Sequence, residues 1–184
     1  KTKYNILEVA NTHGGDISYL KKLISEFSHF DGVGMKFQPF YYDEIATPDY
    51  EWYNVYKELY FTKKEWNEII SLASKTKDIW IDVGNNYCID IINQNSSSIK
   101  GIKFQASVLG NKILLNQLAE LDLSDKITIL NIASLELSEI EKYLHSITSS
   151  LNSKKTVLQI GFQNYPCSRN ESRCLGRRSY MLAY

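Results

Sequence analysis

The sequence lacks several features that would place it in a specialised class of protein. Its 21 lysine and arginine residues balance 21 aspartate and glutamate residues, so the formal net charge is zero. A binder of nucleic acid held by a strongly basic surface is therefore not expected. No apolar run reaches the roughly 18 residues of a membrane span. Glu8 interrupts the start of the chain too early for a secretory signal peptide. We expect neither nucleic acid nor membrane as a partner.

Cysteine is also scarce, and three common site motifs are missing. The chain has 3 cysteines, Cys88, Cys167 and Cys174, and none forms a Cys-x-x-Cys pair. This sparse, odd set indicates free thiols in a reducing compartment, so we expect a cytoplasmic protein. No cysteine and histidine cluster has zinc spacing, no Gly-x-Ser-x-Gly elbow occurs, and no glycine-rich phosphate loop follows a predicted strand.

Arginine is absent from everything before the C-terminal tail. All four arginines, Arg169, Arg173, Arg177 and Arg178, lie close together at the end of the chain. We therefore divide the chain into a domain at residues 1–166 and an atypical tail at residues 167–184. The tail is either a segment foreign to the natural reading frame or a basic partner-binding extension, and we leave it out of the fold prediction.

Six short β-branched runs alternate with amphipathic stretches. The runs, bounded by Gly, Asn, Asp or Ser, predict buried strands at residues 6–10, 33–38, 79–83, 101–105, 127–132 and 156–162. Apolar spacing predicts a helix at 17–27 with Asp16 as its N-cap, and a second helix with a capping box that begins at Thr62. A second capping box is predicted at Ser138, a leucine stripe at 114–121, and a weaker helix at 86–93.

This alternation predicts parallel strands joined by right-handed crossovers. Two architectures compete. An open doubly wound sheet fits the chain length, because a complete (β/α)8 barrel usually needs about 250 residues. In both architectures, ligand chemistry collects at the carboxyl ends of the strands.

Two lysines stand inside apolar strands near these ends. Lys36 and Lys103 occur in similar Lys-Phe-Gln contexts. A lone buried ammonium costs several kcal/mol, so each needs an anionic partner. The pair suggests a bound anion with more than one negative group. The alternative is internal ion pairs, for example Lys36 with Glu8.

The polar residues after the first two strands leave several possibilities open. His13 is a candidate general base, metal ligand or sugar contact, or else a solvent-facing loop residue. A segment rich in tyrosine at residues 41–60, which also carries Asp43, Glu44 and Asp49, either covers a sugar site or forms a packed long loop.

Three stretches of the chain resemble the sialic acid synthases, which include N-acetylneuraminate synthase and the legionaminate and pseudaminate synthases. The segment Glu8–Asp16 is similar to the family's Glu-x-Gly-x-Asn-His-Asn-Gly motif at Glu8, His13 and Gly15. The segment Gly34–Phe40 is similar to its Val-Lys-Phe-Gln-Thr-Phe strand, and residues 53–70 resemble the helix before the third strand. The likeness covers residues 5–166 in order.

The resemblance implies a TIM-type (β/α)8 barrel, here incomplete, with about six βα units. It implies a transferase that forms a carbon–carbon bond between phosphoenolpyruvate and an N-acetylmannosamine-type sugar, assisted by Mn2+ or Mg2+. On this basis Glu8 and His13 are predicted catalytic residues. The predicted substrate-binding residues are Lys36, Gln38, Lys103 and Asn131.

The chain also departs from the family at the metal site. Ile160 stands where the family has a metal-binding histidine, so no metal ligands are evident. The leading hypothesis is a divergent, shortened synthase-like enzyme. A second is an inactive relative that binds an anionic sugar or phosphoenolpyruvate. A third is an inactive folding fragment, whose two exposed sheet edges a homodimer would cover.

Overall fold

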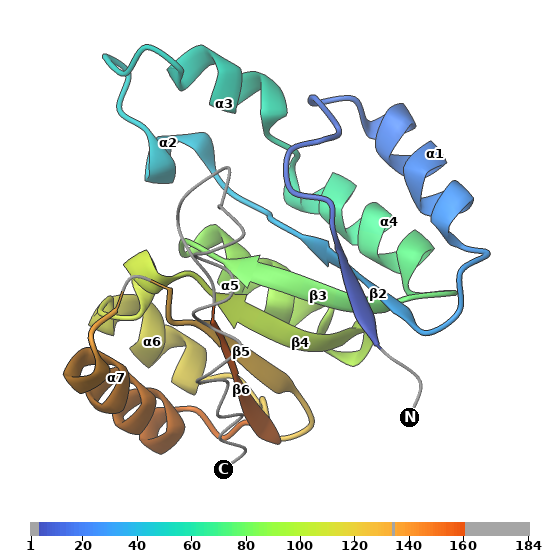
Figure 1. Cartoon of the computed structure of the whole chain (residues 1–184). Helices are drawn as coiled ribbons and strands as arrows, with labels where there is room; N and C mark the ends of the chain where they lie inside the picture. The colour runs from blue at the N-terminus through green and yellow to red at the C-terminus, as the bar shows by residue number, and fades with distance from the viewer. Residues whose placement is uncertain (1–3, 134, 161–184) are drawn as a thin grey trace, which may run out of the picture. The chain divides into compact units, whose positions relative to one another are not determined.

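The computed structural model describes residues 4–133 and 135–160. The described residues fall into two compact units, divided between Ile102 and Lys103, which we describe separately. The predicted boundary at residue 166 and the tail lie outside the described residues. The elements, in chain order, are β1 (Asn5–Glu8), α1 (Ile17–Phe27), β2 (Val33–Phe37), α2 (Tyr42–Ile45), α3 (Tyr53–Leu59), α4 (Lys63–Ala73), β3 (Asp78–Val83), α5 (Tyr87–Gln94), η1 (Ser96–Ser98), β4 (Ile99–Phe104), η2 (Ala106–Val108), α6 (Lys112–Ala119), β5 (Ile127–Asn131), α7 (Leu137–Ser150) and β6 (Lys155–Gln159) (Figure 1).

The strand order distinguishes between the two predicted architectures. The six strands follow one another in the sheet in chain order, β1 to β6. The pairs β1–β2, β2–β3 and β5–β6 are parallel. A doubly wound sheet reverses its strand order at a switch point, whereas a barrel adds each strand beside the previous one. The topology is therefore that of an incomplete α/β barrel, and the open doubly wound alternative is wrong.

The helices of the first unit form where local signals place them. The Asp16 carboxylate accepts the backbone N–H groups of Ser18 and Tyr19 at 2.8 and 3.0 Å, which confirms the predicted N-cap of α1. The Thr62 hydroxyl accepts the backbone N–H of Glu65, whose carboxylate accepts the N–H of Thr62 at 2.7 Å, so the predicted capping box is confirmed.

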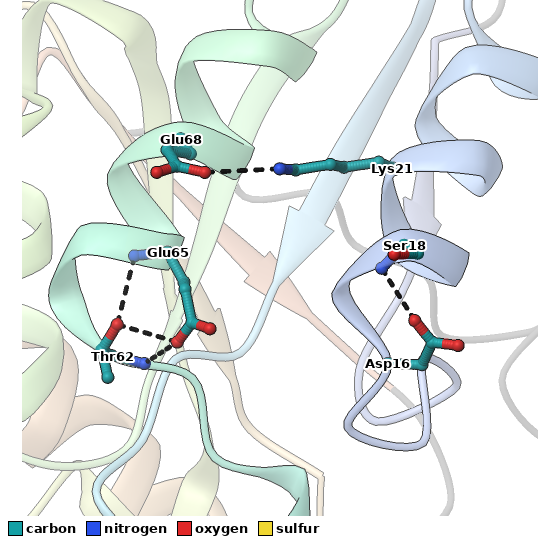
Figure 2. A network of polar contacts seen from close by, with 6 residues as sticks. All are labelled: Asp16, Ser18, Lys21, Thr62, Glu65 and Glu68. Atoms are coloured by element: carbon teal, nitrogen blue, oxygen red, sulfur yellow. Dashed lines mark hydrogen bonds and ion pairs between the residues drawn. The ribbon is translucent and has the colours of Figure 1, made fainter.

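Helices α1 and α4 lie side by side, and both cover the same face of the sheet formed by β1, β2 and β3 (Figure 1). Leu20 and Ile24 of α1 are buried, as is the apolar stripe of α4. Alternate strand residues such as Phe37 and Ile81 are buried too. The Phe37 ring contacts the Trp66 indole of α4 at 5.9 Å between centroids. An ion pair from Lys21 to Glu68, at 3.3 Å, joins the two helices at the surface (Figure 2). Because both partners are nearly half exposed, it adds little to stability.

Two predictions about helix limits were wrong. Residues 53–70 form two helices, α3 and α4, because Thr62 is extended and caps a new helix. The N-cap of α7 is Glu136, two residues before the N-cap predicted at Ser138. The capping box instead joins Glu136 and Glu139, and the Glu139 carboxylate accepts the backbone N–H of Glu136 at 3.0 Å. This pair has the three-residue spacing expected from Ser138, but it lies two residues earlier.

In the second unit, β5 and β6 pair from Ile127 with Lys155 to Asn131 with Gln159. Thr128 and Leu130 are buried and alternate with half-buried residues, which shows that β5 is covered mainly on one face. Among the described residues, no helix is long and apolar enough to cross a membrane.

Candidate functional site

Strand register brings three charged side chains together at the carboxyl ends of β1, β2 and β3. Glu8 pairs with Lys36 across β1 and β2, and Lys36 pairs with Trp80 across β2 and β3. Asp82 follows Trp80 by two residues. Because side chains two apart on a strand share a face, Glu8, Lys36 and Asp82 project from the same side of the sheet. This side is opposite to the one that Phe37 and Ile81 present to the helices.

The Lys36 ammonium lies between two carboxylates. It forms an ion pair with Asp82 at 2.8 Å and a second ion pair with Glu8. The side chains of Lys36 and Asp82 are only 6% and 3% exposed, whereas that of Glu8 is 49% exposed. The internal ion pair of Lys36 with Glu8, one of the two alternatives left open by the sequence, is therefore formed. Asp82 is a fixed counterion, and Glu8 is one that solvent can reach.

A buried thiol holds the loops behind this cluster. The Cys88 thiol, at the start of α5, contacts the Pro39 carbonyl oxygen at 2.9 Å, and the Asp82 carbonyl and Asn85 side-chain oxygens at 3.5 Å. Burial raises the pKa of Cys88 to about 11, so the group is a neutral thiol with one proton to donate, and the Pro39 carbonyl oxygen is the nearest of the three acceptors. The thiol therefore lies between the segment that follows β2 and the end of β3.

His13 is buried in the loop after β1. It is only 2% exposed, and its ring packs on Phe61 at 4.6 Å between centroids and meets Trp66 edge-on. Its Nδ1 accepts the backbone N–H of Gly15 at 3.0 Å, and burial lowers its pKa. His13 is therefore not the solvent-facing residue that the sequence left open. Its catalytic role stays a prediction, and this placement gives it a part in shaping the loop beside Glu8.

The other predicted substrate-binding residues are divided between the two units. Gln38 is half-buried just after β2, in the first unit. Lys103 lies in β4 and is 7% exposed. Asn131 ends β5, where its amide donates to the Gln105 side chain at 3.1 Å and accepts the Ala133 backbone N–H at 3.0 Å. The structure thus brings Glu8 together with Lys36, while the roles of Gln38, Lys103 and Asn131 stay predictions.

Sequence reasoning did not select Asp82 as a site residue. It is the more buried of the two carboxylates that pair with Lys36, although it lies 46 residues away along the chain. The available signal was Asp82 itself, a carboxylate inside the apolar run 79–83. It lies two residues after Trp80, so the two side chains share one face of the strand. That signal does not reveal which lysine the carboxylate meets, because the pairing depends on strand register.

The described residues do not fit the divalent metal that the resemblance implies. Within residues 4–133 and 135–160, no group of three or more His, Cys, Asp or Glu side chains could hold a metal ion. The carboxylates of Glu8 and Asp82 both bind the Lys36 ammonium, which takes the place that a cation would have. Ile160 has no ligand atom. We therefore derive no step through a metal.

Comparison with known proteins gives similarity in structure only. No protein-family profile matches the sequence, and no curated protein matches it. The structure is similar to that of an N-acetylneuraminic acid (sialic acid) synthetase from Leptospira borgpetersenii serovar Hardjo-bovis, solved in complex with citrate, with a TM-score of 0.80 and 20% sequence identity. The similarity covers 96% of this chain and 60% of the synthetase.

A second similar structure is a spore coat polysaccharide biosynthesis protein from Bacillus subtilis. Its TM-score is 0.68 at 18% identity, covering 90% of this chain and 45% of that protein. The chain thus spans less than two thirds of either neighbour. The resemblance to sialic acid synthases, first seen in three sequence stretches, is confirmed at the level of the fold.

Proposed function

We propose that the chain is a sialic acid synthase-like enzyme, which condenses phosphoenolpyruvate with an N-acetylmannosamine-type sugar in nonulosonic acid biosynthesis. The observation that supports this most is a buried lysine with one fixed and one accessible carboxylate, at the carboxyl ends of strands in a synthase-like fold. In α/β barrels this end of the strands carries the active site.

The two carboxylates have different parts in this proposal. Asp82 stays on Lys36 and keeps the ammonium in place. Glu8, whose side chain is half exposed, moves off Lys36 when an anionic group of phosphoenolpyruvate takes its position. The exchange leaves Lys36 with two negative partners throughout, so the buried charge is never left uncompensated.

The displaced Glu8 carboxylate is then available as a proton acceptor. Carbon 3 of phosphoenolpyruvate forms a bond to the sugar's aldehyde carbon, and positive charge develops at carbon 2. The electron pair of the aldehyde C=O bond moves to its oxygen. Water adds to carbon 2 and gives one proton to Glu8, which passes it to that oxygen. The carbon–oxygen bond to phosphate then breaks, and the remaining hydroxyl proton leaves with the phosphate as carbon 2 becomes a ketone. The products are the nine-carbon sugar acid and inorganic phosphate.

One finding favours a second candidate function, an inactive relative that only binds an anionic sugar or phosphoenolpyruvate. Lys36 is already neutralised within the chain, and the described residues provide no metal site. An anion would then compete with Glu8 for Lys36 without any turnover.

The test measures phosphate release and phosphoenolpyruvate binding in the same preparations. For the enzyme, release requires both phosphoenolpyruvate and N-acetylmannosamine. Glu8→Gln then lowers release about 100-fold or more while phosphoenolpyruvate still binds. Lys36→Met abolishes binding, and Lys21→Met, which removes an exposed lysine on α1, is the matched control. Binding without release by the unaltered chain supports the second candidate, and absence of both rejects the two functions together.

A further inference from the structure

A hollow lined by tyrosines lies on the segments that follow β2 and β3, and its lining includes none of Glu8, Lys36 and Asp82. We call it the tyrosine pocket. Its volume is about 330 Å³, and its aromatic wall consists of Tyr41, Tyr60 and Tyr87. Each ring contacts the other two, with centroids 5.6 to 6.4 Å apart. A pocket of this size is near the lower end of the range for small-molecule sites.

The wall is fixed in place by the first unit. The Tyr87 hydroxyl donates to the Phe61 carbonyl oxygen at 2.8 Å, and Tyr87 as a whole residue is only 6% exposed. Tyr41 and Tyr60 pack against it but stay half-buried. Tyr41 and Tyr60 are therefore partly exposed residues of the lining, and their contacts with the buried Tyr87 reduce the ordering that a ligand would have to impose on them.

Polar groups line the rest of the tyrosine pocket. Glu44 accepts the backbone N–H of Tyr87 at 3.2 Å, which holds its carboxylate at the start of α5. Lys63 and Asp90 form an ion pair at the rim. Asn86 is exposed, and its side-chain amide makes no hydrogen bond with any other described residue. The pocket thus offers carboxylate acceptors and an amide that both donates and accepts.

These features together indicate one class of ligand. Aromatic faces pack against the C–H face of a ring, while carboxylate and amide groups bind the hydroxyls around its edge. Two carboxylates against one ammonium leave the lining with a net negative charge, which disfavours an anion. We propose that the tyrosine pocket binds a neutral monosaccharide, at a site separate from the anion site at Lys36. This inference goes beyond the proposed function, since it requires neither phosphoenolpyruvate nor turnover.

The experiment titrates the full 184-residue chain with sugars of different charge while NMR follows the tyrosine ring signals. N-Acetylmannosamine is the neutral probe and glucuronate is the anionic one. We expect saturable shifts of Tyr41, Tyr60 and Tyr87 with a Kd on the order of 1–10 mM, typical of a small polar ligand. Glucuronate should bind about tenfold more weakly or not at all.

Substitutions locate the site. Asn86→Ala removes an amide that caps nothing, so the fold is retained, and it should raise the Kd about fivefold or more. Asn93→Ala, an exposed asparagine on the same helix outside the pocket, should leave the Kd within about twofold. Glu44→Gln gives a second test of the polar wall, and a urea unfolding curve for each variant checks its fold.

The outcomes also separate this proposal from the function at Lys36. Sugar binding that survives Lys36→Met and is not displaced by phosphoenolpyruvate supports the tyrosine pocket, even if no synthase activity exists. The proposal is overturned if the tyrosine signals show no saturable change up to about 50 mM sugar. It is equally overturned if Asn86→Ala leaves the affinity unchanged, or if phosphoenolpyruvate displaces the sugar.

Discussion

Breaking the ion pair of Lys36 with Asp82 should destabilise the protein far more than removing Glu8. At 2.8 Å and an effective dielectric constant of about 20, the attraction is about 6 kcal/mol before desolvation is subtracted. Asp82→Asn or Lys36→Met removes one member of this buried pair and leaves the other charge in the interior, so each should lower the free energy of unfolding by about 3–5 kcal/mol. Glu8→Gln acts on a half-exposed partner and should cost less than about 1 kcal/mol.

A double-mutant cycle measured by urea unfolding checks this reasoning. The variant with both Asp82→Asn and Lys36→Met removes the two charges together, so its loss should fall short of the sum of the single losses by about 2 kcal/mol or more. Additive losses would refute the claim that the buried pair is coupled. A loss for Glu8→Gln equal to that for Asp82→Asn would refute the distinction between a fixed and an exchangeable carboxylate.

Three further predictions concern the loop after β1 and the start of α4. Burial lowers the pKa of His13 below its ordinary 6.5, so the unfolded chain takes up a proton first and stability falls as the pH drops below about 6.5. His13→Asn, which keeps an acceptor for the backbone N–H of Gly15, should flatten the fall in urea midpoint between about pH 7 and pH 5; an unchanged slope would contradict this. Gly15→Ala would place a Cβ 2.2 Å from the Glu58 carbonyl oxygen and should cost about 3 kcal/mol or more in thermal unfolding, whereas Gly14→Ala, also at positive φ but with open space, should cost about 1 kcal/mol. Equal losses would show that the contact is not tight. Thr62→Ala removes the capping hydroxyl and should lower the free energy of unfolding by about 1 kcal/mol, a loss that chemical denaturation would detect.

The sequence was most informative where a signal is short in range. The carboxylate of Asp16 and the hydroxyl of Thr62 bind backbone groups within three residues, so their caps could be predicted without the fold. The same kind of signal gave the wrong residue at Ser138. The pair Glu136 and Glu139 has the same spacing as Ser138 and Glu141, and it caps the helix two residues earlier. A local rule finds a helix start but does not choose between adjacent candidates.

The candidate site was only partly predictable for a related reason. Lys36 was selected because an ammonium in an apolar strand needs a partner, and Glu8 was named as one alternative. Asp82 was not, because its contact with Lys36 depends on the register of β2 and β3. The tyrosine pocket likewise combines Tyr41 and Tyr60 with Tyr87, which follows a different strand. The segment at 41–60 was recognised as rich in tyrosine, but its partner on α5 was not.

The sequence by itself determined the order of the six strands and of the helices between them other than α2 and α3, their apolar positions, and the need to neutralise Lys36. These follow from side-chain periodicity and the cost of burying a charge, which are properties of the chain alone. Only the tertiary structure decided that the strands lie in barrel order and that Asp82 is the fixed counterion. It also decided that Asn86 and Tyr87 face the tyrosines of an earlier segment. Such pairings join residues far apart in the chain, and they become definite only when strand register and helix packing bring those residues into contact.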